Sequence, residues 1–522
     1  MEIQSRSAFV TGNARRAALT ALICSPLLVF VSGALRNQQA DNLLPAFFST
    51  DTLSWFYWDQ SRYGSVHSFL AFPIQNIRLN LIFQLHLRAA SLIFLVCWIV
   101  ESCVRSDSEN RKSHVQRLVA FVFVVAFLLT YQEAGDALIY GANAHPIAIP
   151  FAILALSVNF QRSHKESNYL RSIALLVWVI AFWGVAIWTS IFTALWAPAL
   201  VLLQIAYISK YEKVFKIGYA VWLAFQVVVV TTWSWVFSQI AKNGGENTSF
   251  VRGRFISEAL RRSYVSVPLA LFLVFAVSAT ALVFFRGRNW TNTFILLSTV
   301  FFVGSVPVIA ASTHVQQYSY MPRYFGVQYI SALLILVVLL SGNIRATRLD
   351  ALIRSVGSRR RLFTIVALTF FMLTVSVTAL SDVGFGTGKV DASGFVNTGQ
   401  GLAKELDKSI SGQMDGDPMF VAGSYWYVWP LVFDYRSHSR EVIAITKKAT
   451  HQSDFPKLYS AKVVAGLCVG ESIRCWGATI NAQLNGQQLY SEIGVDVLGY
   501  LSDGTPIREM WVSKYPIRRL ER

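Results

Sequence analysis

Arginines in one loop have the chemistry to bind phosphate. Arg252 and Arg254 lie in the segment 241–264, which the charge pattern described below places outside the cytoplasm, where basic residues are normally scarce. The guanidinium fork matches the oxygen geometry of a phosphate, so these side chains could cradle a phosphate-bearing lipid substrate. Contact with anionic lipid headgroups is an equally good interpretation.

One arginine outside that loop, Arg323, is placed where it needs an anionic partner. Arg323 and Tyr324 open an expected apolar helix over 324–341, at its outer end. A cation at the start of a helix opposes the helix dipole, and on the outer face it also opposes the usual charge bias. We therefore expect Arg323 to meet either an acid of the first loop or the phosphate of a ligand.

The first loop carries three acids, Asp41, Asp51 and Asp59, beside four consecutive aromatic residues, Trp55 to Trp58. If residues 50–60 form a helix, Asp51 and Asp59 are about 80° apart around it and ~12 Å apart along it, so both could face one groove. The structural alternative for each acid is a helix N-cap or a solvated surface charge. The aromatic residues are most simply an interfacial belt that holds a short helix at the headgroups.

Two more acids and a histidine stand at the ends of neighbouring apolar runs. Glu133 and Asp136 lie at the outer end of the run 117–132, and His145 opens the run 144–160 just before a proline. Ionisable groups at membrane depth are costly, which favours a functional role. Hydration near the interface is the alternative, because these residues lie close to the run ends.

Long apolar runs must position these residues. Of 522 residues, 54% are hydrophobic and only 14% charged, against roughly 25% charged residues in soluble domains. This composition excludes a soluble enzyme, and runs of ~20 residues disfavour a β-barrel. We expect an α-helical polytopic membrane protein with about eleven transmembrane helices. The expected crossings are 17–35, 81–103, 117–132, 144–160, 170–188, 192–209, 216–240, 265–285, 291–311, 324–341 and 361–380.

The net charge of +17 is explained by topology. Lysines and arginines concentrate in alternate breaks between the runs, whereas the breaks near 131–145 and 188–192 contain none. This positive-inside pattern places the N-terminus in the cytoplasm and predicts no nucleic-acid partner. An odd number of crossings then places everything after residue 381 outside the cytoplasm.

The C-terminal tail differs in composition from the rest. We expect a multi-pass domain over 1–380 with a long first external loop (36–80), a linker over 381–400 and a soluble external domain over 401–522. The tail predicts a small α/β or mostly β fold. Its expected elements are a helix at 398–411 and strands at 418–422, 425–433, 441–446, 461–468, 476–480, 494–501 and 508–513. Cys468 and Cys475 lie close enough in sequence to suggest a disulfide in an oxidising compartment.

Several segments resemble the GT-C superfamily of polytopic glycosyltransferases, and its bacterial branch in particular. The resemblance rests on the stretches DTLSWFYWDQSRYGSVHSF, FPIQN, GANAHPIAIPFAILAL and MPRYFGVQYISALLIL, and on FVAGSYWYVWPLVFDYR in the tail. It spans roughly 17–343 in patches. It implies transfer of a sugar from a polyprenyl-phosphate carrier to a glycan, lipid or protein acceptor at the periplasmic face of the bacterial inner membrane.

The resemblance also implies roles for individual residues. An acid of the first loop is the catalytic base in that superfamily, and the matching positions are Asp51 first and Asp59 second. Arg323 or the arginines of 241–264 would stabilise charge on the leaving phosphate. The adjacent acid pair of many members is absent here, so we expect no metal site, with a divalent cation left as an open alternative.

Other functions fit the same composition. A polysaccharide polymerase or ligase would use the same compartment and a lipid-linked donor, with the loop 241–264 as its candidate site. A secondary transporter would be expected to show inverted repeats, and none is visible in the sequence. An envelope assembly protein whose tail binds a partner is the third alternative.

Overall fold

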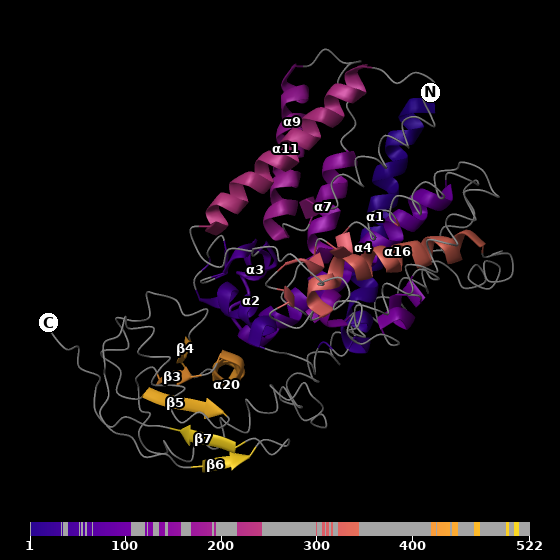
Figure 1. Ribbon diagram of the computed structural model, residues 1–522. Helices are drawn as coiled ribbons and strands as arrows, with labels where there is room; N and C mark the ends of the chain where they lie inside the picture. Colours follow the sequence, from indigo (N-terminus) through magenta and orange to yellow (C-terminus); the bar gives the residue numbers. More distant parts are fainter. Residues whose placement is uncertain are drawn as a thin grey trace. The chain divides into compact units, whose positions relative to one another are not determined.

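The computed structural model (Figure 1) describes helices, strands and the turns beside them. The chain divides into two compact units. Unit 1 comprises Met1–Ser32, Arg62–Val66 and Leu85–Leu373, and unit 2 comprises Gly33–Ser61, His67–Gln84 and Thr374–Arg522. The described residues are 2–32, 34, 40–51, 53, 56–57, 60–64, 66–105, 121–122, 124–128, 135–140, 145–157, 169–190, 193–194, 217–242, 299, 305–307, 309–312, 315–316, 322–343, 419–423, 425–438, 441–446, 464–469, 497–500 and 506–510.

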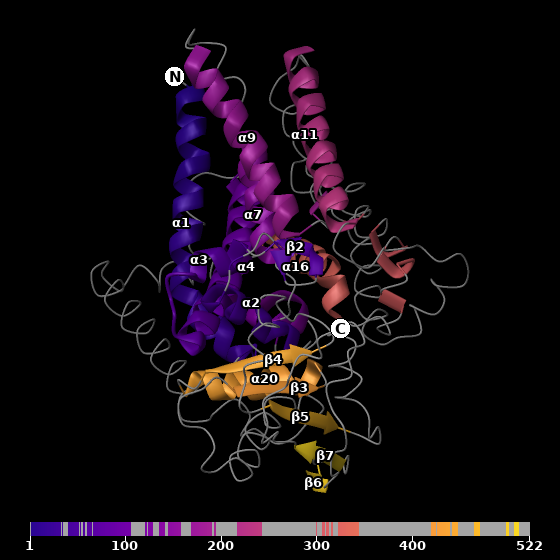
Figure 2. The ribbon, with the colours of Figure 1, turned by 90° about the vertical axis from the view of Figure 1, so that its left-hand side faces the viewer.

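The described part of unit 1 is mostly helical. Its helix α9 packs against both α7 and α11, and the views in Figures 1 and 2 show α7 and α9 side by side. The elements are α1 (Glu2–Val31), the greater part of α4 (Ile77–Arg105), the π-helix η1 (Asp136–Tyr140), α7 (His145–Ser157), α9 (Tyr169–Thr189), α11 (Ile217–Lys242), the 3₁₀ helix η2 (Pro322–Phe325) and α16 (Gly326–Asn343).

Helices α9 and α11 are joined by specific contacts within an apolar interface. A Cβ atom on Gly184 would lie 2.8 Å from Cε2 of Trp233, so the glycine lets that ring approach the backbone of α9. The same ring donates its Nε1–H to the carbonyl of Ile180 at 3.0 Å. In the other direction, Nε1 of Trp183 donates to Oε1 of Gln226 at 3.1 Å. Small residues and interhelical hydrogen bonds of this kind are typical of helix pairs in membranes.

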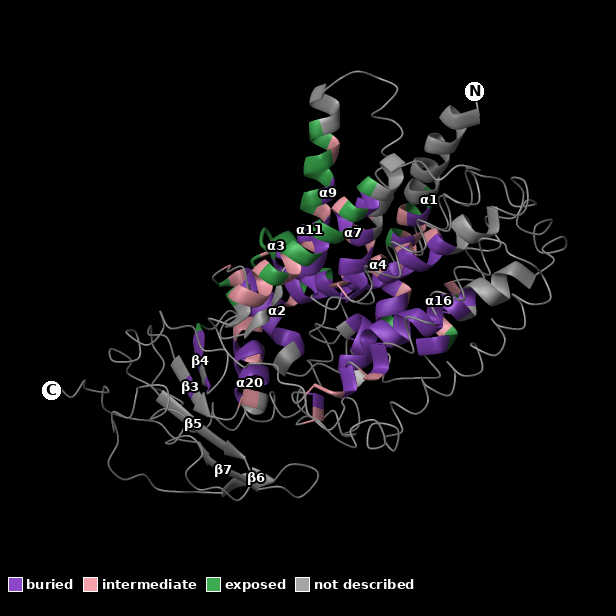
Figure 3. Cartoon of the chain, turned by 45° about the horizontal axis from the view of Figure 1, so that its top comes forward, coloured by how far each residue is buried: buried purple, intermediate pink, exposed green. Residues whose placement is uncertain are grey.

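Among the residues that the structure describes, two helical segments are long and apolar enough to cross a membrane, Ile77–Ile99 in α4 and Val221–Ile240 in α11. Arg16–Phe30, Ile173–Thr189 and Gly326–Ile335 are shorter apolar helices. Large apolar side chains are exposed along α9 and α11 (Figure 3), among them Val177, Trp178, Val228 and Trp235. The expectation of a mostly helical protein with membrane-length helices is therefore confirmed in this coarser form.

Six of the expected crossings coincide with described helices. Helices α1, α4, α7, α9, α11 and α16 overlap the expected runs 17–35, 81–103, 144–160, 170–188, 216–240 and 324–341. The runs 265–285 and 361–380 lie outside the described residues, and 117–132, 192–209 and 291–311 are described only in part. The total of eleven stays a prediction.

Unit 2 contains a five-stranded mixed sheet with strand order β4-β3-β5-β7-β6 (Figure 2). Strand β3 runs parallel to both β4 and β5, whereas β7 is antiparallel to β5 and β6. The strands are β3 (Met419–Gly423), β4 (Val442–Thr446), β5 (Val464–Val469), β6 (Val497–Tyr500) and β7 (Pro506–Met510). Each overlaps a strand expected from the sequence; the expected strand at 476–480, the helix at 398–411 and the linker 381–400 lie outside the described residues.

The expected strand at 425–433 is wrong, because this segment belongs to helix α20 (Tyr425–Ser437). Parallel strands such as β3 and β4 need a crossover connection, and α20 supplies it. Its buried residues Val428, Leu431, Val432 and Tyr435 recur with helical spacing. A short apolar run is ambiguous between helix and strand, which explains the error.

The expected helix over residues 50–60 is also wrong. Helix α2 (Ala40–Thr50) ends where that helix was expected to begin, and β1 (Phe56–Tyr57) pairs with β2 (Gln60–Gly64) in a small sheet. Aromatic residues favour strands, and this preference prevails here over the expected interfacial helix. The geometric argument that placed Asp51 and Asp59 on one helical face therefore fails.

Candidate active site

Asp51 lies immediately after the last residue of α2. Its backbone N–H donates to the carbonyl of Phe47 at 2.9 Å, and Oγ1 of Thr50 donates to the carbonyl of Ala46 at 3.0 Å. The Asp51 side chain is 28% exposed. Asp51 is therefore not an N-cap: it stands at the C-terminal end of the helix, where a negative charge opposes the helix dipole and gains from a cationic partner.

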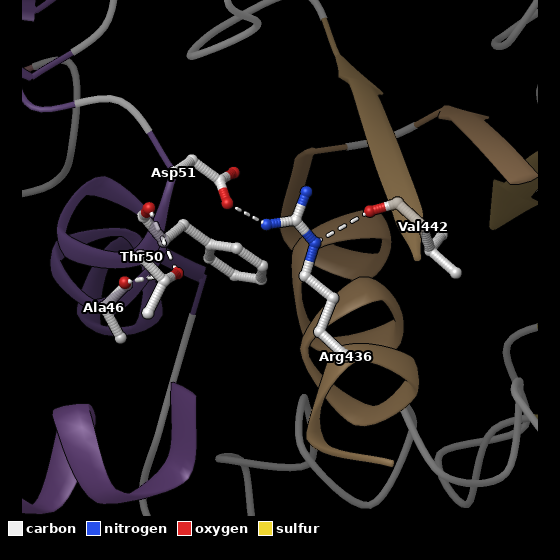
Figure 4. A network of polar contacts seen from close by, with 6 residues as sticks. Ala46, Thr50, Asp51, Arg436 and Val442 are labelled. Carbon is white, nitrogen blue, oxygen red and sulfur yellow. Dashed lines mark hydrogen bonds and ion pairs between the residues drawn. The ribbon is translucent and has the colours of Figure 1, made fainter. Parts of the chain in front are cut away.

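That cationic partner is Arg436 of α20 (Figure 4). Its Nη1 forms an ion pair and hydrogen bond with Oδ1 of Asp51, and its Nε donates to the carbonyl of Val442 at 2.8 Å. The guanidinium carbon also lies 5.4 Å from the centre of the Phe47 ring, within the range of a cation–π interaction. Three separate contacts thus fix the orientation of the arginine head group.

Buried aromatic rings hold α2 and α20 together beneath this ion pair. The Phe47 ring centre lies 4.7 Å from that of Trp429 and 5.9 Å from that of Phe433, both in edge-to-face geometry. Trp429, Phe433 and Arg436 are spaced four and three residues apart, so they share one face of α20. The pair Asp51–Arg436 consequently has a rigid apolar base and a partly exposed polar surface.

A carboxylate held in this way can accept a proton or a hydrogen bond from a bound hydroxyl. Arg436 compensates its negative charge and fixes its position, while partial exposure leaves it accessible from solvent. A general base must come within hydrogen-bond distance of the proton that it removes, so a fixed orientation favours this chemistry. The ion pair is also compatible with a purely structural role.

A second cluster of candidate residues lies in unit 1, and we call it the His145 cluster. It consists of η1, the first residue of α7, the residue after α9 and the junction between η2 and α16. Nδ1 of the buried His145 lies 2.7 Å from Oγ of Ser190. A Cβ atom on Gly326 would lie 2.7 Å from Cδ2 of His145 and 3.0 Å from the carbonyl oxygen of Ala137, so three elements meet closely at this glycine.

The His145 cluster brings together elements that carry four of the residues singled out in the sequence. Asp136 lies in η1, His145 begins α7, and Arg323 and Tyr324 lie in η2, which contacts η1. Tyr324 is buried. π-Helices are rare, and those that occur are often found at functional sites. The π-helix η1 is therefore a further feature that favours a functional role for this cluster. The expectation that Arg323 pairs with a first-loop acid is not tested, because its side chain is not described.

The remaining expected site residues cannot be placed. Asp59, Glu133, Arg252, Arg254 and Cys475 lie outside the described residues, and for Cys468 only its position in β5 is described. Within the described parts of the chain, no three His, Cys, Asp or Glu residues gather as a metal site would require.

Arg436, Ser190 and Gly326 lie at these sites although none was singled out in the sequence. A signal exists only for Arg436: once residues 425–437 are read as a helix, its spacing from Trp429 and Phe433 places it on the same face. Under the strand interpretation of this segment, that helical spacing is not apparent. The partners of Ser190 and Gly326 are distant in sequence and carry no local pattern.

Comparisons with known proteins do not assign the chain to a family. No protein-family model matches the sequence. No curated protein matches it either.

Proposed function

We propose that the chain is a polytopic membrane glycosyltransferase that takes a sugar from a polyprenyl-phosphate carrier. The acceptor is an envelope glycan, a lipid or a protein at the periplasmic face of a bacterial inner membrane. The observation that carries the proposal is the position of Asp51, a first-loop carboxylate that is partly exposed and oriented by Arg436. The sequence resemblance to GT-C enzymes gives this acid its role.

In the proposed reaction the acceptor hydroxyl attacks the anomeric carbon of the donor sugar. A new carbon–oxygen bond forms, the bond from the anomeric carbon to the phosphate oxygen breaks, and the polyprenyl phosphate leaves with the bonding electrons. The transition state has oxocarbenium character, and Asp51 takes the hydroxyl proton. Because phosphate is a good leaving group, a carboxylate whose charge is already compensated by an arginine is a sufficient base.

The His145 cluster is proposed to bind polar parts of the substrate. Its support is the meeting of η1, the start of α16 and the start of α7 around a buried histidine. Arg323, and Arg252 and Arg254 of the loop 241–264, are proposed to compensate the charge of the phosphate.

The membrane arrangement is part of the proposal. Eleven crossings, a cytoplasmic N-terminus and an external tail are supported by the lysine and arginine pattern and by the membrane-length segments in α4 and α11. The exposed apolar side chains along α9 and α11 add support, because lipid is the solvent that tolerates them.

The test is mass spectrometry of envelope glycans from a deletion strain of the bacterium that carries the gene. The strain is complemented with wild type, with Asp51→Asn, or with Glu441→Gln, which changes an exposed acid of the same unit. We expect one sugar to disappear on deletion, to return with wild type and Glu441→Gln, and to stay absent with Asp51→Asn at matched membrane levels.

Two other outcomes contradict the proposal at different levels. If Asp51→Asn restores the sugar, the acid is structural and the assignment of the base is wrong. If deletion changes no glycan, transport or envelope assembly becomes the better interpretation. The polymerase or ligase alternative depends on the loop 241–264, almost all of which lies outside the described residues, and no described contact favours it.

A further inference from the structure

Helix α3 (Val66–Ala71) and the turn after it have an inverted pattern of exposure. His67 and Ser68 are fully buried, whereas Leu70 is 51% exposed and Phe72 is 45% exposed. Phe69 is exposed as well. In a water-facing helix the apolar side chains would point inward and the polar ones outward.

The same inversion continues into the first turns of α4. Asn80 and Gln84 are buried there, while Leu79 and Phe83 are exposed. Each of these pairs has a spacing of four residues, so each forms a stripe along one side of the helix. Figure 3 colours the exposed residues beside the α3 label green. We call the exposed large apolar residues of α3, the turn after it and the start of α4 the α3–α4 apolar patch: Phe69, Leu70, Phe72, Leu79 and Phe83.

A buried hydrogen-bond network holds the patch in this orientation. Ser68 Oγ donates to the carbonyl of Pro45 at 2.9 Å, and Ser49 Oγ donates to the carbonyl of Ser68 at 2.8 Å. Asn80 Nδ2 donates to Ser49 Oγ at 2.8 Å, and Gln84 Nε2 donates to Asn80 Oδ1 at 2.7 Å. Asn80 Nδ2 also donates to the carbonyl of Ala71, the last residue of α3, at 3.0 Å. Turning α3 over would therefore break its hydrogen bonds to both α2 and α4.

We propose that the α3–α4 apolar patch inserts into the interfacial region of the lipid bilayer beside α4. The patch is continuous with the membrane-length segment Ile77–Ile99, since Leu79 and Phe83 belong to both. Polar exposed residues, Gln75 and Asn76, stand between α3 and α4 and mark the level of the headgroups. An apolar face of this kind is buried ~5–10 Å into the boundary between headgroups and acyl chains. The inference uses the membrane part of the proposed function and does not depend on glycosyl transfer.

The experiment places one fluorescent amino acid by amber suppression at Leu70, Val228 or Glu441 of the full chain. Val228 is 61% exposed on α11 and reports whether that helix meets lipid, and Glu441 is an exposed polar position in unit 2. Each variant is reconstituted into phosphatidylcholine–phosphatidylglycerol vesicles. Quenching is then compared for lipids with a nitroxide at acyl carbon 5 or 12, and for aqueous iodide.

We expect the probe at position 70 to be quenched at least twofold more strongly by the carbon-5 nitroxide than by the carbon-12 nitroxide, and to be shielded from iodide. The probe at position 441 should show the reverse preference for iodide over lipid. If the probe at 228 is quenched by lipid but the probe at 70 responds only to iodide, the patch lies in water and the inference is wrong. If neither quencher reaches position 70, protein covers the patch and a lipid occupant is excluded. If the probe at 228 is not quenched by lipid, the membrane placement fails together with this inference.

Discussion

Arg436 forms an ion pair with Asp51, a residue 385 positions earlier in the chain. The guanidinium also contacts the carbonyl of Val442 and the ring of Phe47, so one side chain links α2, α20 and the start of β4. Both members of the pair are partly exposed, with 20% of the Arg436 side chain and 28% of the Asp51 side chain accessible. The pair is therefore placed both to stabilise the packing of α2 against α20 and to present the Asp51 carboxylate to a substrate. These two roles need separate tests.

Exchanging the two charges separates the roles. Asp51→Arg alone and Arg436→Asp alone each place like charges together, and we expect each to lower the free energy of unfolding. The double variant restores an ion pair, so a double-mutant cycle should show a favourable coupling of about 1 kcal/mol. Unfolding is followed in mild detergent by titration with SDS.

The same double variant should remain inactive in glycan complementation, because the carboxylate has moved to α20. Recovery of both stability and glycan by the exchange would contradict a role of Asp51 as base. A coupling of zero would show that the ion pair contributes no stability.

Arg436→Lys tests the shape of the cation. Lysine keeps the charge but lacks the planar fork that serves Asp51 and the Val442 carbonyl at once. We expect a loss of about 1–2 kcal/mol in the free energy of unfolding, since the partly buried carbonyl of Val442 loses its donor. Arg436→Met, which keeps length without charge, should lose more; equal stability of the two variants would show that the charge is unimportant.

Phe47→Ala should remove the apolar base of the ion pair. The ring is fully buried against Trp429 and Phe433, so its deletion should cost about 3–5 kcal/mol. The matched control is Phe30→Ala, because Phe30 is 45% exposed and its loss should cost about 0.5 kcal/mol or less. Both are measured by the same SDS titration, and equal effects would contradict a core position for Phe47.

Local patterns allowed much of the fold to be predicted from the sequence. The apolar runs over α4 and α11 predict helices because their length and composition are properties of the segment alone. The strands β3, β4 and β5 were likewise expected from short apolar runs between turn residues. The segment 425–433 predicts a strand because its apolar residues are nearly continuous, and the buried face of α20 is defined only by how the helix packs.

The site was predictable only in part. Asp51, His145 and Tyr324 stood out as polar or charged groups beside apolar runs, which is a local signal. Arg436, the partner of Asp51, has no such signal. Pairing across hundreds of residues depends on how α2 and α20 pack, and neither segment contains a sequence pattern that predicts it. The same holds for the approach of Gly326 to His145.

Gly326→Ala tests the close approach in the His145 cluster. The added methyl group would lie 2.7 Å from Cδ2 of His145 and 3.0 Å from the carbonyl oxygen of Ala137, so the elements must shift. We expect a loss of about 1–3 kcal/mol in the free energy of unfolding. In the double variant Gly326→Ala/His145→Ala the ring is gone, so the added effect of the Gly326 substitution should become smaller. Additive effects would place the glycine away from the histidine.

Asn80→Ala tests the network that orients the α3–α4 apolar patch. Asn80 donates to Ser49 Oγ and to the carbonyl of Ile74, each at 2.8 Å, and accepts from Gln84. The bonds to Ser49 and from Gln84 are buried, so removing the amide should cost about 1–3 kcal/mol through buried polar atoms that lose their partner. The matched control is Asn76→Ser, because Asn76 is exposed. Serine keeps a side-chain acceptor for the backbone N–H groups of Arg78 and Leu79 at the start of α4.

The control should change the free energy of unfolding by less than about 0.5 kcal/mol, because serine is a good N-cap residue. The two asparagines are four residues apart, so a difference between them reports burial rather than the helix as a whole. If the network is what turns Leu70 outward, Asn80→Ala should also weaken the quenching of a probe at position 70 by nitroxide lipids, and Asn76→Ser should leave it unchanged. Loss of stability without a change in quenching would show that packing of α3 against α2, and not the hydrogen bonds, sets the orientation of the patch.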